Sequence, residues 1–313
     1  MHITTALTLL STAATACAAN CSPNSKSPFP LGELSKDQHT SKGRRYRVHL
    51  PKAYDPTKPA PLILSYHGAH GTIEKQAALD GLTDSGRNRD HVVVYLQALV
   101  PEGSDKTEWE VAPGAENTDD VGFTADVVAA IEDKLCIDSR RVYATGKSQG
   151  GGFVGQVLAC DAKLSKTFAA FAPDTPKSKC EPETQVAIPC AGTKRKDTPI
   201  MAFHGGADET IPYRGTWRKK TNSCLPDIRH WARQWVVRDG LQGTETNTTI
   251  AGSKHGVRSA WRDERVVLVY DGDEVAHDWP STGENSDNNG HAHAAFNASD
   301  DIMKWFPKWK LDN

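Results

Sequence analysis

Three residues far apart in the chain, Ser148, Asp208 and His277, have side chains of the types that perform acyl transfer together. A serine hydroxyl is a weak nucleophile until a neighbouring imidazole accepts its proton, and an aspartate can hold that imidazole in the required tautomer. Ser148 lies in Gly146-Lys147-Ser148-Gln149-Gly150, a GxSxG motif. The glycines permit a sharp turn that leaves the hydroxyl uncovered, so the motif predicts a nucleophile elbow. Because five-residue motifs also arise by chance, the structural setting decides its value.

Each of these residues follows a predicted strand. Ser148 follows the β-prone run 141–145 and precedes a helical pattern, Asp208 follows the apolar run 200–203, and His277 follows the apolar run 266–270. Functional side chains of open parallel sheets gather beyond the carboxyl ends of the strands, so all three are expected at one edge of a sheet. The chain order Ser, Asp, His is that of an α/β-hydrolase triad.

Other residues remain alternatives for two of these roles. The alternative acids are Asp174, which follows another strand, and Asp271 and Asp273, which precede His277. The alternative bases are weaker because they lie at a strand end or in stretches without a preceding strand; they are His204, His255, His291 and His293.

The chain alternates short β-rich segments with helical patterns, which predicts an α/β protein with the α/β-hydrolase fold, a mostly parallel sheet with helices on both faces. Several predicted strands are continuous apolar runs, as expected for strands buried on both faces. The predicted strands are 46–50, 62–66, 92–96, 142–145, 168–172, 200–203 and 266–270, and the predicted helices are 74–85, 120–135, 150–159, 227–239 and 300–309. The segment 174–199, rich in Pro, Lys and Thr, is predicted to be a long excursion on the catalytic face.

Acyl transfer produces a negatively charged oxygen, which two backbone N–H groups are expected to bind. One is the amide of Gln149, directly after the nucleophile. The other is expected in the loop that follows an early strand, where Ala69 is preferred and Gly68 is the next choice. Trp109 and Trp279 are candidates for stacking on a substrate, with packing in the core as an equally weighted alternative.

The N-terminus predicts secretion. The first eighteen residues contain no Asp, Glu, Lys or Arg and end in Ala16-Cys17-Ala18, so 1–18 are predicted to be a signal peptide and 19–313 a single catalytic domain. Six cysteines then remain, an even number typical of disulfides in secreted proteins. The expected pairs are Cys136 with Cys160, Cys180 with Cys190, and Cys21 with Cys224. Glycosylation sequons at Asn247, Asn297 and Asn20 agree with this route.

Charge and ligand spacing argue against several classes of partner. The formal net charge is −2 without a long run of either sign, so neither nucleic acid nor an anionic membrane is expected as a partner. The basic cluster 218–220 is interpreted as a solvated loop. Neither CxxC spacing nor a nearby histidine pair accompanies the cysteines, so no metal site is predicted. The sequence does not predict an oligomeric state.

Seven strings distributed over the chain carry a family resemblance: LILSYHG, TDDVGFTADVV, CIDSRRVYATGKSQGGGF, FAAFAP, FHGGADETIPYRG, CLPDIRHWARQW and AHDWPST. In these strings the chain resembles fungal feruloyl esterases of the type C group, which are secreted and related to polyhydroxybutyrate-depolymerase-like and carbohydrate esterase family 1 proteins. The family's serine, aspartate and histidine fall on Ser148, Asp208 and His277.

The resemblance implies an extracellular serine carboxylic ester hydrolase that needs no cofactor. Its implied substrates are feruloylated plant cell-wall polysaccharides or oligosaccharides, from which it would release ferulate or p-coumarate. Two alternatives stay open: an esterase acting on acetylxylan or a polyhydroxybutyrate-type polyester, and a non-catalytic carbohydrate-binding protein on the same scaffold. Preference among ferulate, p-coumarate, caffeate and sinapate is not predicted.

Overall fold

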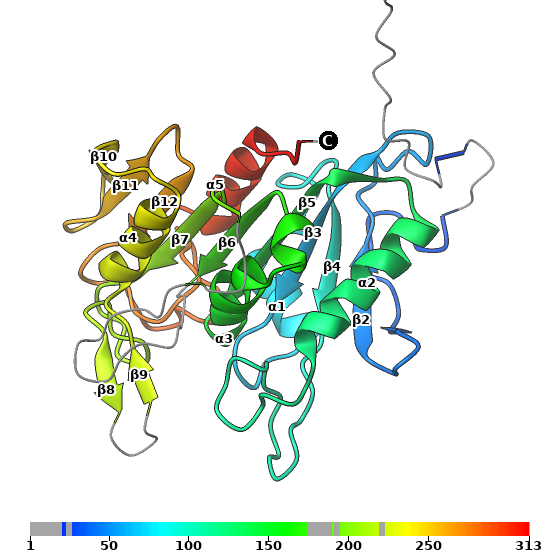
Figure 1. The fold of residues 1–313 in the computed structure, drawn as a ribbon, viewed down its shortest axis with the longest axis horizontal. Coiled ribbons are helices and arrows are strands. Elements are labelled where there is room, and N and C mark those ends of the chain that lie inside the picture. Colours follow the sequence, from blue (N-terminus) through cyan, green and yellow to red (C-terminus); the bar gives the residue numbers. More distant parts are fainter. Residues whose placement is uncertain (1–20, 23–26, 175–189, 191–194, 219–222, 313) are drawn as a thin grey trace, which may run out of the picture.

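A ten-stranded sheet runs through the molecule with helices on both faces (Figure 1). The computed structural model describes residues 21–22, 27–174, 190, 195–218 and 223–312. The strand order is β1-β2-β4-β3-β5-β6-β7-β12-β11-β10. The strands are β1 Gln38–His39, β2 Arg45–His49, β3 Ala60–Tyr66, β4 Val92–Leu96, β5 Ile137–Lys147, β6 Ala170–Asp174, β7 Ile200–His204, β10 Glu245–Thr249, β11 Val257–Trp261 and β12 Val266–Tyr270.

The six central strands, from β4 to β12, are parallel, and two antiparallel strands extend the sheet at either edge. The carboxyl ends of β3, β5, β7 and β12 therefore lie along one edge. This architecture is the α/β-hydrolase arrangement that the sequence predicts. The predicted bounds 92–96 and 266–270 coincide with β4 and β12 because both strands are continuous apolar runs.

Alternate side chains of the central strands enter two hydrophobic cores, one on each face of the sheet. Leu62 and Leu64 pack with one group of helices, while Ile63, between them, packs with the other. The first group contains α2 Asp120–Lys134, α3 Gln149–Gly152 and α4 Ile228–Arg238, and the second contains α1 Ile73–Asp80 and α5 Ala298–Trp305, on the opposite side of the sheet (Figure 1). Among the described residues, no helix combines the length and apolar character needed to cross a membrane.

The helix after the nucleophile differs from the expected continuous helix over 150–159. Only α3 is α-helical, and it is followed by the π-helical turn η1 Phe153–Val157 and the short 3-10 helix η2 Leu158–Cys160. The glycines at 150–152 are poor helix formers, which weakens the hydrogen-bonding pattern here. A Cβ at Gly151 would overlap the carbonyl oxygen of Asp174, so the close packing of α3 on β6 requires glycine.

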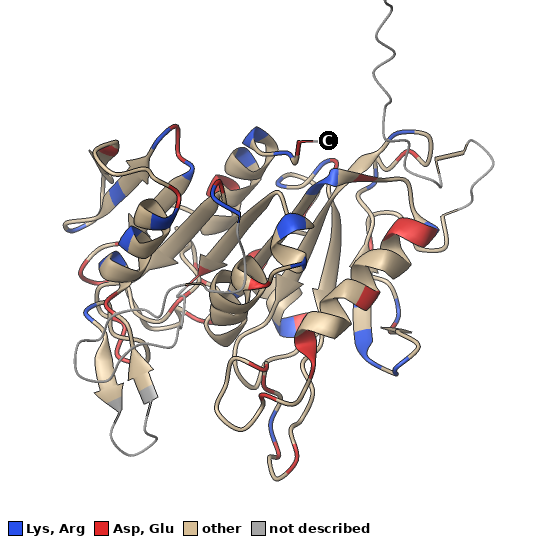
Figure 2. Ribbon diagram, viewed as in Figure 1, with Lys and Arg blue, Asp and Glu red and all other residues tan. Residues whose placement is uncertain are grey.

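Several strands were not predicted. The edge strand β10 reads Glu-Thr-Asn-Thr-Thr and is mostly exposed, so it carries none of the apolar alternation that identifies a half-buried strand. The hairpin β8 Thr216–Arg218 and β9 Ser223–Leu225 was also missed. The basic cluster 218–220 lies partly outside the described residues, as does most of the predicted excursion 174–199. Acidic and basic residues are interspersed over the described elements (Figure 2).

The three expected cysteine pairings are wrong. Cys21 pairs with Cys136, and Cys160 pairs with Cys190. Cys224 is also disulfide-bonded, while Cys180 lies outside the described residues. The expectation failed because pairing depends on where the N-terminal segment and the long excursion run, and no periodic pattern in the sequence specifies either path.

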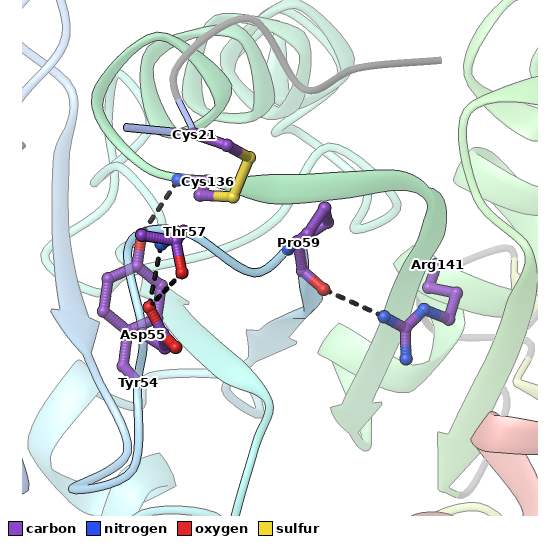
Figure 3. Close-up of a disulfide and its surroundings, with 7 residues drawn as sticks. All are labelled: Cys21, Tyr54, Asp55, Thr57, Pro59, Cys136 and Arg141. Carbon is purple, nitrogen blue, oxygen red and sulfur yellow. Dashed lines mark hydrogen bonds between the residues drawn. A yellow bond between two sulfur atoms is a disulfide. The ribbon is translucent and has the colours of Figure 1, made fainter. Parts of the chain in front are cut away.

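The Cys21–Cys136 disulfide fastens the N-terminal segment beside the start of β5 (Figure 3). The same place is held by the Cys136 amide, which donates to the Tyr54 hydroxyl at 2.8 Å, and by the Ala60 amide, which donates to the Cys136 carbonyl at 2.9 Å. This end of β5 is opposite to the end that carries Ser148. The disulfide is therefore a structural element at the opposite edge of the sheet from Ser148.

Removing this disulfide is expected to destabilise the fold without altering the active site. Its cysteines are 115 residues apart, so the variant with Cys21→Ser and Cys136→Ser should lose about 2–5 kcal/mol of unfolding free energy, measured by denaturant titration. The variant with Cys160→Ser and Cys190→Ser opens a 30-residue loop, and the chain-entropy model gives a loss about 1 kcal/mol smaller. Parental stability of the first variant would contradict this role.

Candidate active site

Ser148 occupies a strained turn between β5 and α3. Its backbone has φ 54° and ψ −115°, a conformation that costs a residue other than glycine about 1–3 kcal/mol. The surroundings maintain it, because a Cβ at Gly150 would overlap the carbonyl oxygens of Tyr66 and His67 at the end of β3. The Ser148 amide also donates to the carbonyl of Asp174 at 3.1 Å. The motif therefore forms the tight elbow that its glycines predict.

The structure brings Ser148, His277 and Asp208 into one hydrogen-bonded line. His277 Nε2 lies 2.8 Å from Ser148 Oγ, and His277 Nδ1 lies 2.7 Å from Asp208 Oδ2. Because an ionised carboxylate only accepts, Nδ1 carries the proton and Nε2 is free to accept the hydroxyl proton. The Asp208 side chain is 0% exposed whereas that of His277 is 17% exposed, so the imidazole is within reach of a ligand.

The Asp208 carboxylate is held ionised and in a fixed orientation. Burial alone would raise its pKa, but the hydrogen bond from His277, together with the nearby imidazoles and the Ile211 amide, leaves the pKa below its ordinary value. Its Oδ1 accepts from the Ile211 amide at 2.7 Å, and its Oδ2 lies 3.4 Å from His204 Nε2. Burial lowers the pKa of His204 to about 4, so this histidine is neutral, and its Nε2 donates to the Ile211 carbonyl.

The loops that carry Asp208 and His277 are packed directly against each other. The Ala207 amide donates to the Val275 carbonyl at 2.8 Å, and the Gly206 amide donates to the Gly272 carbonyl at 2.9 Å. A Cβ at Gly205 would overlap the carbonyl oxygens of Val275 and its neighbour. The Gly-Gly pair after β7 thus allows the contact that sets the acid against the base.

An ion pair that the sequence did not suggest joins the nucleophile to the histidine loop. Lys147 Nζ lies 3.1 Å from Asp287 Oδ2, and the two side chains are only 11% and 20% exposed. The same carboxylate accepts from the amide of Trp279, two residues after His277, at 3.2 Å. The pair therefore connects the residue before Ser148 with the segment after His277. No spacing rule predicts it, since Lys147 and Asp287 are 140 positions apart.

The loop after β3 lies beside the nucleophile, as the oxyanion-hole expectation requires. A Cβ placed on Gly68 would be 3.5 Å from the Cβ of Ser148. Within the described part of the chain, the amides of Gln149 and Ala69 donate to no other residue. The Gln149 side chain faces elsewhere, since its Oε1 accepts from the Trp109 amide at 2.8 Å.

His67 supports this loop and is not placed to exchange protons with a substrate. Its Nδ1 donates to the Gly68 carbonyl at 2.7 Å, and its Nε2 accepts from the Ala98 amide at 3.1 Å. Burial lowers the pKa of His67 to about 4, so the ring is neutral at physiological pH. His70, also on this loop, is half-exposed and lies 3.4 Å from Glu108.

Trp109 and Trp279 do not present their rings to a substrate, so that expectation is wrong. Trp109 is 0% exposed, stacks on Phe153 and donates from Nε1 to the His67 carbonyl at 2.7 Å. Trp279 is 1% exposed and donates from Nε1 to Ser299 Oγ at 3.0 Å. Trp109 belongs to one hydrophobic core and Trp279 to the other.

The alternative acids and bases do not take the places of Asp208 and His277 in this arrangement. Asp174 and Asp271 are buried at strand ends, and burial raises the pKa of Asp271 well above its ordinary value. Asp273 accepts from the Tyr270 hydroxyl and contacts His255, both at 2.7 Å. His291 lies 3.1 Å from Asp278, and no hydrogen bond between His293 and another described residue is present. His277 and Asp208 thus form the pair next to Ser148.

Comparison with solved structures confirms the fold class. The acetyl xylan esterase from Aspergillus awamori superimposes with a TM-score of 0.60 and 15% sequence identity, over 88% of this chain and 99% of that one. The fold and the Ser, His, Asp arrangement together define an α/β-hydrolase. No family model matches the sequence.

In sequence the chain is similar to fungal feruloyl esterases. It is 29% identical over 217 residues to feruloyl esterase B of Piromyces equi and 33% identical over 169 residues to feruloyl esterase D of Neurospora crassa. These matches cover 66% and 51% of this chain and span only 37% and 56% of those two relatives. A longer match, 26% identical and covering 85% of this chain, joins it to 88% of a probable feruloyl esterase C of Aspergillus oryzae. The family resemblance predicted from the sequence strings is thereby confirmed.

Proposed function

We propose that this protein is a feruloyl esterase, a serine carboxylic ester hydrolase that releases hydroxycinnamic acids from sugars of plant cell-wall polysaccharides. The observation that carries the proposal is the hydrogen-bonded line from Ser148 Oγ through His277 to the buried Asp208 carboxylate, with distances of 2.8 and 2.7 Å. It occurs in a chain whose relatives are named feruloyl esterases.

The reaction would proceed as two acyl transfers. Ser148 Oγ attacks the ester carbonyl carbon while its proton passes to His277 Nε2. The bond to the sugar oxygen breaks, and the sugar alcohol leaves with the proton from Nε2. Water then gives a proton to Nε2 and attacks the acyl carbon, which releases the acid and returns the proton to Ser148. Asp208 keeps the tautomer in place and stabilises the imidazolium in both steps.

The negative oxygen of each tetrahedral intermediate would be bound by the amides of Gln149 and Ala69. Support for this assignment comes from the closeness of Gly68 to Ser148 and from the absence of an acceptor for either amide among the described residues. A single donor of this kind contributes about 10²–10³ to kcat in other serine hydrolases.

The protein is further proposed to be secreted, with 1–18 as signal peptide and 19–313 as one catalytic domain. Disulfides at Cys21, Cys136, Cys160, Cys190 and Cys224 support an oxidising compartment. Asn247, on the exposed strand β10, is the favoured glycosylation site. Asn297 is less favourable because the Ser299 hydroxyl of its sequon is buried, and Asn20 lies outside the described residues.

A substrate panel tests the proposed activity. Methyl esters of ferulate, p-coumarate, caffeate and sinapate should be hydrolysed with kcat/KM within the ordinary enzyme range of about 10⁴–10⁸ M⁻¹s⁻¹ for at least one of them. Acetylated xylan and polyhydroxybutyrate provide the contrast. Turnover of either polymer with no turnover of any hydroxycinnamate would replace the proposed function with one of its alternatives.

Breaking the ion pair between Lys147 and Asp287 should slow the reaction without removing any catalytic group. Lys147→Met is expected to lower kcat/KM for methyl ferulate by about 10–100-fold, because a small misplacement of the base has effects of this size. Lys147→Arg preserves the charge and should recover part of the loss. Parental kcat/KM in both Lys147→Met and Lys147→Arg would show that the ion pair has no role in positioning His277.

A further inference from the structure

A cavity of about 530 Å³ lies between α4 and the strands β10, β11 and β12. We call it the edge-strand pocket. Helix α4 packs over β12, and its Arg229 side chain reaches Ser259 on β11 and Glu245 on β10. Its polar wall is made by Tyr213, Arg214, Arg229, Asn247, Ser259 and Tyr270.

The charged groups at the edge-strand pocket are Arg214, Arg229 and Asp273, with Glu245 paired to Arg229. The Arg229 guanidinium donates to Glu245 at 2.6 Å. Its other contact, with Ser259 Oγ, is long, at 3.4 Å. Arg214 is exposed and forms no ion pair with any residue of the described chain. Asp273, the acidic residue of the lining, already contacts Tyr270 and His255. The Arg214 guanidinium and one edge of Arg229 therefore remain available to an anion.

The rest of the lining combines apolar surface with hydrogen-bonding groups, as sugar binding requires. The rings of Tyr213 and Tyr270 lie 4.7 Å apart at 58° and are both partly exposed, which provides apolar surface for a pyranose face. Ser259 Oγ donates to Asn247 Oδ1 at 2.6 Å, and Asn247 Nδ2 donates to Glu245 Oε1 at 3.2 Å. This network keeps polar groups in fixed positions around the apolar floor of Val257 and Leu268.

We propose that, in chains without a glycan on Asn247, the edge-strand pocket binds a uronic acid residue of an oligosaccharide or polysaccharide, with the sugar carboxylate held by Arg214 and Arg229 and the ring against the tyrosines. A guanidinium recognises a planar carboxylate through paired hydrogen bonds, which favours a uronate over a neutral sugar. The choice of a cell-wall saccharide as ligand rests on the proposed function. The recognition of a carboxylate rests on the exposed Arg214 guanidinium, which has no ion pair among the described residues.

The pocket adjoins the catalytic loops. The Tyr213 ring contacts the His204 ring, with centroids 5.6 Å apart, and His204 lies 3.4 Å from the Asp208 carboxylate. Gly206 and Asp273 of the lining belong to the two loops that carry Asp208 and His277. A polymer bound in the edge-strand pocket would thus be retained beside the triad, so an acidic polysaccharide gains affinity that a small ester does not.

Direct binding tests the proposal independently of catalysis. The protein used for binding has two substitutions. Ser148→Ala prevents turnover, and Thr249→Ala removes the Asn247 sequon without changing a residue of the lining. Titration calorimetry compares trigalacturonate with its fully methyl-esterified form. The acid is expected to bind at least about tenfold more tightly, and its Kd should rise with added NaCl because exposed charge pairs are screened. Equal affinity for acid and ester would overturn the proposal.

A matched pair of arginine variants locates the interaction. Arg214→Gln in the same protein should raise the Kd for trigalacturonate by about tenfold. Arg89→Gln removes another exposed arginine, on the loop before β4, and should leave that Kd unchanged. Parental affinity in Arg214→Gln, or an equal loss in Arg89→Gln, would show that the acid binds elsewhere or through net charge. Hydrolysis of methyl ferulate by the parent chain is measured separately, so failure of the proposed function and failure of the pocket are distinguished.

Discussion

Replacing Ser148 with alanine is expected to lower kcat/KM for methyl ferulate by a factor of about 10⁴–10⁶. The hydroxyl lies 2.8 Å from His277 Nε2 and is the group that would form the covalent acyl-enzyme. Without it, the amides that we propose to bind the oxyanion remain, so a small residual rate above the uncatalysed reaction should persist. The change removes one oxygen atom from a strained turn, so folding should be retained.

The control for this variant is Ser85→Ala, an exposed serine on the loop after α1. Ser85→Ala should retain parental kinetics, and both variants should unfold at similar denaturant concentrations. Parental turnover in Ser148→Ala would remove this residue from the mechanism. If Ser148→Ala lost both activity and the folding transition, the assay would be repeated with Ser148→Cys, which keeps a nucleophile at this position.

Replacing Asp208 with asparagine is expected to lower kcat by about 10⁴-fold. The Ile211 amide donates to Oδ1 at 2.7 Å, so the asparagine oxygen should stay on that donor and its NH₂ group should face His277. His277 Nδ1 would then have to accept, which places the proton on Nε2, where it cannot take the serine proton. The variant also loses the negative charge that stabilises the imidazolium.

Asp105→Asn serves as the matched control because Asp105 is exposed on the loop after β4. Its rate should equal that of the parent. If Asp208→Asn kept most of the activity while Asp273→Asn lost it, the acid of the triad would have been assigned to the wrong residue. The change at Asp208 should appear mainly in kcat, since the carboxylate is buried behind the imidazole and does not touch substrate.

The sequence predicted those parts of the site that depend on local rules. The elbow at Ser148 follows from glycines whose neighbours leave no room for a Cβ, and the strands before Asp208 and His277 follow from apolar runs buried on both faces. The order of the parallel strands then brings the three loops to one edge. Strand β10 escaped prediction because an edge strand that faces solvent needs no apolar residue.

The parts that escaped prediction depend on contacts between distant segments. Cys21 and Cys136 meet only because of the path of the N-terminal segment, and Lys147 meets Asp287 only because the histidine loop returns over the elbow. Trp109 illustrates a different difficulty, since its residue type suits stacking on a substrate as well as packing in a core. Its 0% exposure and its hydrogen bond to His67 settle the matter in favour of packing.

Trapping of the acyl-enzyme tests the central proposal most directly. The parent chain is mixed with an activated ferulate ester, the reaction is quenched in acid during turnover, and the peptides are analysed by mass spectrometry. A feruloyl group on the peptide that contains Ser148, absent from the Ser148→Ala protein, is the predicted result. Feruloylation of a different residue during turnover, or continued turnover by Ser148→Ala at the parental rate, would contradict the account.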